Sequence, residues 1–200
     1  MYEELVRRLE AAPAKNYEVQ DAENLADEVL KIYGHIGKSA PTPIVNIARA
    51  LGFETFKVFN IPDDISGNIF IGGTTRNDYN VNTDKVIVVG DKEILPHQRF
   101  IIAHELAHYF MDYIGNPAYA DPAVKFSQTY PKENHESKEE IRADRFAAEL
   151  LMPKRVFLSE YVNALERSDF RLEYTVPYLA KLFNVKESCV RRRILEVAKN

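Results

Sequence analysis

The chain has 200 residues, 46% of them hydrophobic, with a formal net charge of −4 at pH 7 and a sequence pI near 5.8. This size and hydrophobic content allow one well-packed core with at most a small appended subdomain, and the acidic balance argues against bulk nucleic-acid binding. A single cysteine excludes an internal disulfide framework, and no apolar run is long enough to span a membrane. Because the N-terminus also shows no signal-peptide pattern, we expect a cytoplasmic protein without membrane partners.

The first half of the chain alternates between helix-forming and strand-forming patterns. Three helices are predicted, over Glu3–Ala11, Asp21 to about Ile36, and Ile44–Leu51. Three β-rich segments follow, over Phe53–Phe59, Gly67–Ile71 and Lys85–Val89, with turns predicted at residues 72–73 and 76–80. We therefore expect a small three-stranded sheet ahead of the next helix.

The second half is predicted to be helical apart from one long loop. Helices are expected over Leu95–Tyr113 and 137–153, from about Pro153 to Glu166, and from about Thr175 and Lys186, while residues 116–136 form a polar loop with three prolines. The predicted fold class is α+β, with a mainly helical core, a small sheet and a short C-terminal helix pair. We expect an N-terminal helix and linker at 1–20, the core at 21–167, and a helix-turn-helix-like subdomain at 168–200 that packs on it.

A His-Glu-x-x-His motif lies inside the apolar helix predicted over Leu95–Tyr113. Residues four apart on a helix share one face at a spacing of about 6 Å, so His104 and His108 can both bind one zinc ion. Glu105 lies close enough to take a proton from the water that zinc activates. Two ordinary histidines on a partly exposed helix are the alternative, which the apolar flanks disfavour because buried charge needs a partner.

Zinc in a catalytic site needs a third protein ligand. His97 lies about 10 Å from His104 along the helix axis, which is too far to bind the same ion. Neither His35 nor Cys189 stands in a ligand pattern. The helix predicted over 137–153 offers two carboxylates one turn apart, Glu140 and Asp144. Glu140 can bind the metal, and Asp144 can accept the other ring N–H of a zinc-binding histidine.

Two alternatives stay open for these carboxylates. Ser137 and Glu140 have the spacing of a capping box, so Glu140 can instead close the N-terminus of its helix. Glu139 and Glu149 are the other candidate ligands on the same helix.

A peptidase also has to hold its substrate and stabilise the oxyanion that forms on the attacked carbonyl. Gly67–Ile71 is the candidate edge strand for an extended substrate, with an interior strand as the alternative. The candidate oxyanion donors are Tyr109, Tyr130, His135 and Arg142, although a solvated loop position is the favoured interpretation of His135.

The C-terminal residues favour a competing function. Residues 171–200 carry seven Lys or Arg against three Glu, and the last two predicted helices resemble a helix-turn-helix with Arg191, Arg192 and Arg193 in the second. A DNA-binding transcriptional regulator is therefore the alternative function. It is disfavoured because three successive arginines point around most of a helix rather than to one face, so packing or docking is the preferred role.

The motif residues together resemble the ImmA/IrrE family of metallopeptidases. The resemblance covers about Ile47 to Pro153, through Arg99-Phe100, Ala103-His104-Glu105-Leu-Ala-His108-Tyr109, Glu140-x-x-Ala143-Asp144-x-Phe146-Ala147 and Leu150-Leu-Met-Pro153. It implies a zinc endopeptidase with one Zn²⁺ per chain, bound by His104, His108 and Glu140, and with Glu105 as the base. It further implies that the partner is a protein substrate, a helix-turn-helix transcriptional repressor. The chain is shorter than members with an added regulatory domain.

Overall fold

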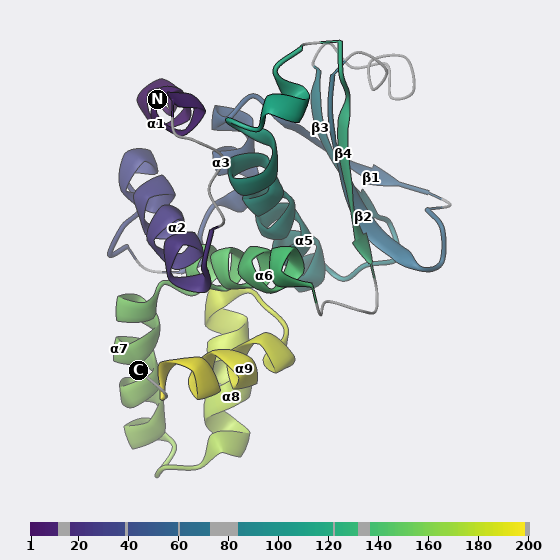
Figure 1. The fold of residues 1–200 in the computed structure, drawn as a ribbon. Coiled ribbons are helices and arrows are strands. Elements are labelled where there is room, and N and C mark those ends of the chain that lie inside the picture. The colour runs from purple at the N-terminus through teal and green to yellow at the C-terminus, as the bar shows by residue number, and fades with distance from the viewer. Residues whose placement is uncertain are drawn as a thin grey trace.

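The computed structural model describes residues 1–11, 17–38, 40–59, 61–72, 84–121, 123–131 and 137–198. The fold is α+β as predicted, with eight α-helices and one sheet within these ranges (Figure 1). The first three helices are α1 (Glu3–Ala11), α2 (Val19–Tyr33) and α3 (Ile44–Ala50). Their bounds confirm the sequence prediction to within three residues.

The sheet has four strands, so the prediction of three was wrong. The strands are β1 (Glu54–Val58), β2 (Ile65–Ile71), β3 (Lys85–Gly90) and β4 (Phe126–Pro131), in the order β1-β3-β2-β4. β1 pairs with β3 in parallel, and the other two pairs are antiparallel. The predicted turn at residues 76–80 and residue 73 lie outside the described residues.

The additional strand, β4, lies within the segment that the sequence predicted as a loop. Its buried residues, Phe126 and Tyr130, are separated by three that are more exposed, which is a weak strand pattern beside three prolines. Pairing with β2 is what stabilises it. The Asn68 side chain adds to that pairing, because its amide nitrogen donates to Thr129 Oγ1 and its Oδ1 accepts from the Ser127 hydroxyl.

Of the two interpretations of Gly67–Ile71, the structure contradicts the edge strand and confirms the interior strand. β2 lies in the interior of the sheet, between β3 and β4. β4 occupies the edge position that had been expected for β2, so any edge used by a ligand on this side of the sheet belongs to β4.

The central helix, α5 (Leu95–His108), lies between the sheet and α6 (Lys138–Leu151) (Figure 1). Every residue from Gln98 to His108 is buried, and a π-helical turn, Tyr109–Tyr113, continues the helix. Polar groups at the end of α5 are therefore enclosed on all sides, which makes each of them costly unless it has a partner.

Three more helices, α7 (Lys154–Arg167), α8 (Leu172–Phe183) and α9 (Glu187–Val197), lie across α6 from the sheet (Figure 1). The buried Arg99 of α5 donates to the carbonyl oxygens of Asn184 at 3.1 Å and of Thr42 at 2.7 Å, and so joins the helix pair α8–α9 to the core. The predicted boundaries of the three chain divisions stay predictions. None of the helices within the described ranges is long and apolar enough to cross a membrane.

Gly67 controls how closely α5 approaches the sheet. A Cβ atom at this position would overlap Cγ2 of Ile101 and lie 2.9 Å from the carbonyl oxygen of Val88. Ile101 is fully buried, three residues before His104, and has no space into which to move.

We predict that Gly67→Ala lowers the free energy of unfolding by about 1–3 kcal/mol, because overpacking a closed interior costs that much. Urea denaturation of the purified variant is the measurement. Removing the clashing group in Gly67→Ala/Ile101→Ala should cost less than the sum of the two single changes. Strict additivity would show that the close packing of β2 on α5 does not depend on this glycine.

Candidate metal centre

Three side chains from two helices converge at the end of α5. His104 and His108 lie one turn apart on α5, and Glu140 extends toward them from the first turn of α6. The Nε2 atoms of the two histidines are 3.0 Å apart, and the Glu140 carboxylate lies 3.1 Å from His104 Nε2 and 3.3 Å from His108 Nε2. Within the described residues, these three form the group of His, Cys, Asp and Glu side chains that could hold a metal ion.

The other candidate ligands have different partners. Glu149 is buried against Arg193, and its carboxylate accepts from the backbone N–H of Lys154. Glu139 extends from the exposed side of α6, with its carboxylate 3.7 Å from Arg142. His97 Nδ1 lies 2.5 Å from Glu93. The structure therefore brings together the histidine pair and Glu140, and not the alternatives.

Glu140 does not use its side chain for capping. Ser137 Oγ accepts from the backbone N–H of Glu140 at 3.2 Å and so caps α6 by itself. The Glu140 carboxylate is instead directed at the two imidazoles, which favours the ligand interpretation over the capping box.

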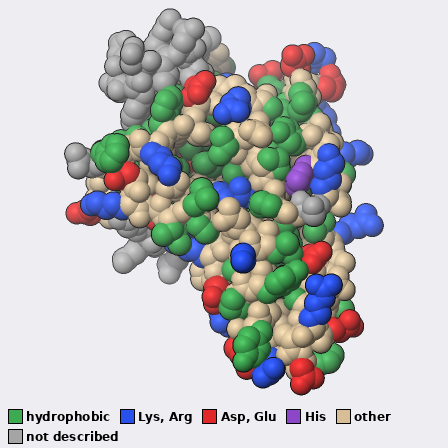
Figure 2. Space-filling view, turned by 180° about the vertical axis from the view of Figure 1, so that it is seen from behind, with side chains coloured by type: hydrophobic (Ala, Val, Ile, Leu, Met, Phe, Trp, Pro, Cys, Tyr) green, Lys and Arg blue, Asp and Glu red, His purple; other side chains and the backbone are tan. Residues whose placement is uncertain are grey.

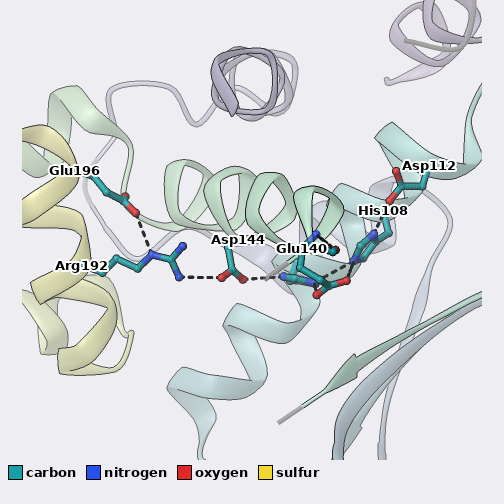
Figure 3. A network of polar contacts seen from close by, with 8 residues as sticks. His108, Asp112, Glu140, Asp144, Arg192 and Glu196 are labelled. Carbon is teal, nitrogen blue, oxygen red and sulfur yellow. Dashed lines mark hydrogen bonds and ion pairs between the residues drawn. The ribbon is translucent and has the colours of Figure 1, made fainter. Parts of the chain in front are cut away.

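Each imidazole is held from behind by a carboxylate. His104 Nδ1 lies 3.0 Å from Asp144 Oδ1, and His108 Nδ1 lies 2.5 Å from Asp112 Oδ2 (Figure 3). We assign the ring proton of each histidine to Nδ1 from these partners. Each Nε2 then presents a lone pair toward the other and toward Glu140, which is the orientation that a metal ion requires.

The donor set and its spacing fit a small divalent cation. A tetrahedral ion with bonds of about 2.0–2.1 Å needs ligand atoms about 3.4 Å apart, and the separations here are 3.0, 3.1 and 3.3 Å. Two imidazoles and one carboxylate form the His₂Glu set that catalytic zinc uses.

The pKa shifts within the cluster agree with a site built for positive charge. Burial lowers the pKa of His108, but its hydrogen bonds to Asp112 and Glu140 outweigh burial and raise that pKa to about 10. Burial raises the pKa of Glu140, yet its contacts with His104 and His108 hold that pKa far below its ordinary value. Both shifts favour a cation between the imidazoles and the carboxylate.

Glu105 has an unusual environment. It is fully buried beside the cluster, and neither of its carboxylate oxygens has a hydrogen-bond partner among the described residues. Burial raises the pKa of Glu105 to about 7, although the nearby His108 and His104 lower it. A buried carboxylate without a partner, poised near neutral pH, is suited to exchange a proton with a bound molecule.

Sequence reasoning missed Asp112 at this site and expected other roles for Arg142 and Arg192. Asp112 follows His108 by four residues, so the helical spacing that relates the two histidines could have identified it. Arg142, expected as an oxyanion donor, forms an ion pair with Asp112 instead. Arg192 of α9 forms one with Asp144 at 2.9 Å, which no local pattern indicates (Figure 3).

Three further oxyanion candidates are Tyr130, Tyr109 and His135. The ring of Tyr130 packs edge-on against His104, with their centroids 4.7 Å apart. The hydroxyl of Tyr109 accepts from Lys85 Nζ at 2.7 Å. His135 lies outside the described residues. Of these, Tyr130 is in contact with a candidate ligand.

Comparison with known proteins identifies a family and a structural likeness. Residues 70–195 match the Peptidase_M78 family, described as the IrrE N-terminal-like domain. No curated protein matches the chain. Among solved structures, it is similar to a Mycobacterium tuberculosis transcriptional regulator, with 20% sequence identity and a TM-score of 0.51 over 95% of this chain and 51% of that one. The chain thus spans about half the length of that protein, and the likeness concerns the fold.

We predict that the purified protein binds one zinc ion per chain and that His104→Ala and His108→Ala each lose most of it, because two remaining ligands hold zinc poorly. Elemental analysis after gel filtration is the measurement. Glu139→Gln is the matched control, since Glu139 precedes Glu140 but faces away from the histidines. Wild-type protein with no more zinc than His104→Ala would contradict the site.

A second prediction concerns Asp112. Asp112→Asn keeps the side-chain size but weakens the hydrogen bond that fixes the His108 ring, so zinc affinity should fall by about 10–100-fold. Competition with a chelator of known affinity measures the change. Asp121→Asn, a change at an exposed aspartate after the π-helical turn, should leave affinity unchanged. Equal affinities of wild type and Asp112→Asn would show that Asp112 does not support the ligand.

Proposed function

Since the chain belongs to the Peptidase_M78 family and carries its metallopeptidase domain, we propose that it is a zinc-dependent endopeptidase in which His104, His108 and Glu140 hold one Zn²⁺ and Glu105 is the general base. The single observation that carries the catalytic assignment is the Glu105 carboxylate, which is buried beside the cluster without a hydrogen-bond partner among the described residues.

Zinc, Glu105 and the two aspartates beside the histidines would have different roles in peptide hydrolysis. Bound zinc would supply Lewis-acid activation of water and of the peptide carbonyl. Glu105 would take the proton of the attacking water and then pass it to the leaving amine, which a carboxyl with a pKa of about 7 can do in both directions. Asp112 and Asp144 keep the imidazole rings oriented while charge develops.

The substrate strand would lie along β4. β4 is at the edge of the sheet, and no strand within the described ranges pairs with its other side. Its Tyr130 touches His104, so a peptide that adds to this edge would pass the metal ligands in extended form. Backbone hydrogen bonds would then hold the scissile bond in place with little dependence on its side chains.

The expected substrate is a helix-turn-helix transcriptional repressor, cut at an exposed linker. This follows from the resemblance to ImmA/IrrE peptidases and agrees with the family described as IrrE N-terminal-like. The structurally similar Mycobacterium tuberculosis protein is named a transcriptional regulator, and that name is in keeping with the proposed link to gene control. A repressor substrate would also place the reaction in the cytoplasm, in keeping with the single cysteine.

Direct DNA binding through the C-terminal helices is disfavoured by where the arginines lie. Arg193 is 1% exposed and pairs with Glu149, and Arg192 pairs with Asp144. Arg191 remains at the surface, with 57% of its side chain exposed. On the face drawn in Figure 2, which is the back of the view in Figure 1, basic side chains are interspersed with acidic and hydrophobic ones.

The test is Glu105→Gln, which keeps the shape of the side chain but cannot take a proton. Zinc content should stay near wild type, while cleavage of a helix-turn-helix repressor encoded beside the gene should fall at least about 100-fold. Mass spectrometry of the products identifies the bond. Cleavage that survives in zinc-loaded Glu105→Gln would remove Glu105 from the mechanism. If zinc-loaded wild type cuts neither this repressor nor a proteome-derived peptide library, the peptidase proposal itself fails.

A further inference from the structure

Asp144 is clamped between two helices. Its Oδ1 lies 3.0 Å from His104 Nδ1 on α5, and its Oδ2 lies 2.9 Å from Nη1 of Arg192 on α9. Arg192 is held in turn by Glu196, whose carboxylate lies 3.2 Å from its Nε. Figure 3 shows these side chains as a continuous row from α9 to the cluster.

This arrangement restricts how Asp144 can move. Because its two oxygens have different partners, rotation of the carboxylate would break the contact with His104 and that with Arg192 together. Asp144 has only 7% of its side chain exposed, so water compensates little for a lost partner. The orientation of the His104 ring thus depends on a residue 88 positions further along the chain.

We infer that Arg192 is a positioning residue of the metal centre, which acts through Asp144 on His104 and makes α9 a part of the peptidase site. The inference rests on the proposed zinc site. The matched family domain extends to residue 195 and so includes Arg192.

The neighbouring arginines separate this role from simple docking of α9. Arg193 is 1% exposed, pairs with Glu149 and donates to the carbonyl oxygen of Met152 at 3.2 Å, so it fixes α9 to α6. Arg191 is exposed and lies 3.6 Å from Glu187 on its own helix. Arg192 is half-exposed beside a cavity of about 310 Å³ between α9 and the core, so little packing depends on it.

The experiment measures zinc affinity of the full chain by competition with a chelator. Arg192→Met keeps much of the aliphatic stem and removes the charge, and it should weaken zinc binding about tenfold, the lower end of the effect of losing an outer partner. Arg192→Lys should recover part of the loss. Arg191→Met is the matched control, one position away on the same helix, and should bind zinc as wild type does.

A double-mutant cycle tests whether the effect passes through Asp144. In an Asp144→Asn background, Arg192→Met should add little further loss of affinity, because the contact that it supports is already weakened. The Co²⁺ absorption spectrum of Arg192→Met should also shift, which a change in packing alone would not cause. Thermal unfolding of the metal-free variants should show that both remain folded, with Arg192→Met the less stable of the two because the nearly buried Asp144 loses a partner.

Two results would overturn the inference. One is wild-type zinc affinity in Arg192→Met, and the other is an equal loss with and without the Asp144 change, which would assign Arg192 a general structural role. His104→Ala, measured in parallel, separates this failure from that of the proposed function. If His104→Ala still binds zinc, the site itself is wrong; if it does not, only the role of Arg192 is rejected.

Discussion

Several ionisable side chains are buried at the end of α5, and the need to compensate their charges is the constraint on which the surrounding structure depends. His104, Glu105 and His108 are at most 1% exposed, and they lie beside Glu140 on a helix that is buried over more than two turns. Desolvating such groups costs several kcal/mol each unless partners compensate. Much of the neighbouring architecture supplies those partners.

The compensation has the same form on both sides of the histidine pair. Each imidazole faces an aspartate, and each aspartate pairs with an arginine, Arg142 from α6 on one side and Arg192 from α9 on the other. When both imidazoles are neutral and both Glu105 and Glu140 are ionised, the charges of these two arginines, the two aspartates and the two glutamates sum to −2. A divalent cation at the cluster would balance that net charge, which links the stability of the folded state to metal binding.

The sheet and the C-terminal helices hold this charged row from two sides. The sheet covers α5 on one flank, and its edge strand β4 brings Tyr130 against His104. Close packing of β2 on α5, permitted by the missing side chain of Gly67, holds the helix against the sheet. The C-terminal helices approach from the opposite side of the aspartate row and hold Asp144 from behind. The peptidase site is therefore assembled from segments that begin at β2 and end at α9.

The sequence by itself determined the helices and the placement of the histidine pair. Helix periodicity is a local property, so the bounds of α1 and the placement of His104 and His108 on one face follow from spacing alone. The same rule could have identified Asp112, and the carboxylates of α6 were identified as alternatives among which spacing could not choose.

Only the tertiary structure decided the rest. It selected Glu140 over Glu139 and Glu149, because the rotation of α6 against α5 sets which carboxylate faces the histidines. It added β4, which has only a weak strand pattern. This strand is stabilised by pairing with β2, nearly sixty residues earlier in the chain. It also gave three successive arginines different environments: Arg191 is exposed, Arg192 pairs with Asp144, and Arg193 is buried against Glu149. The role of each depends on which surface of α9 meets α6. Contacts between distant segments are fixed by packing, and packing leaves no periodic signal in the chain.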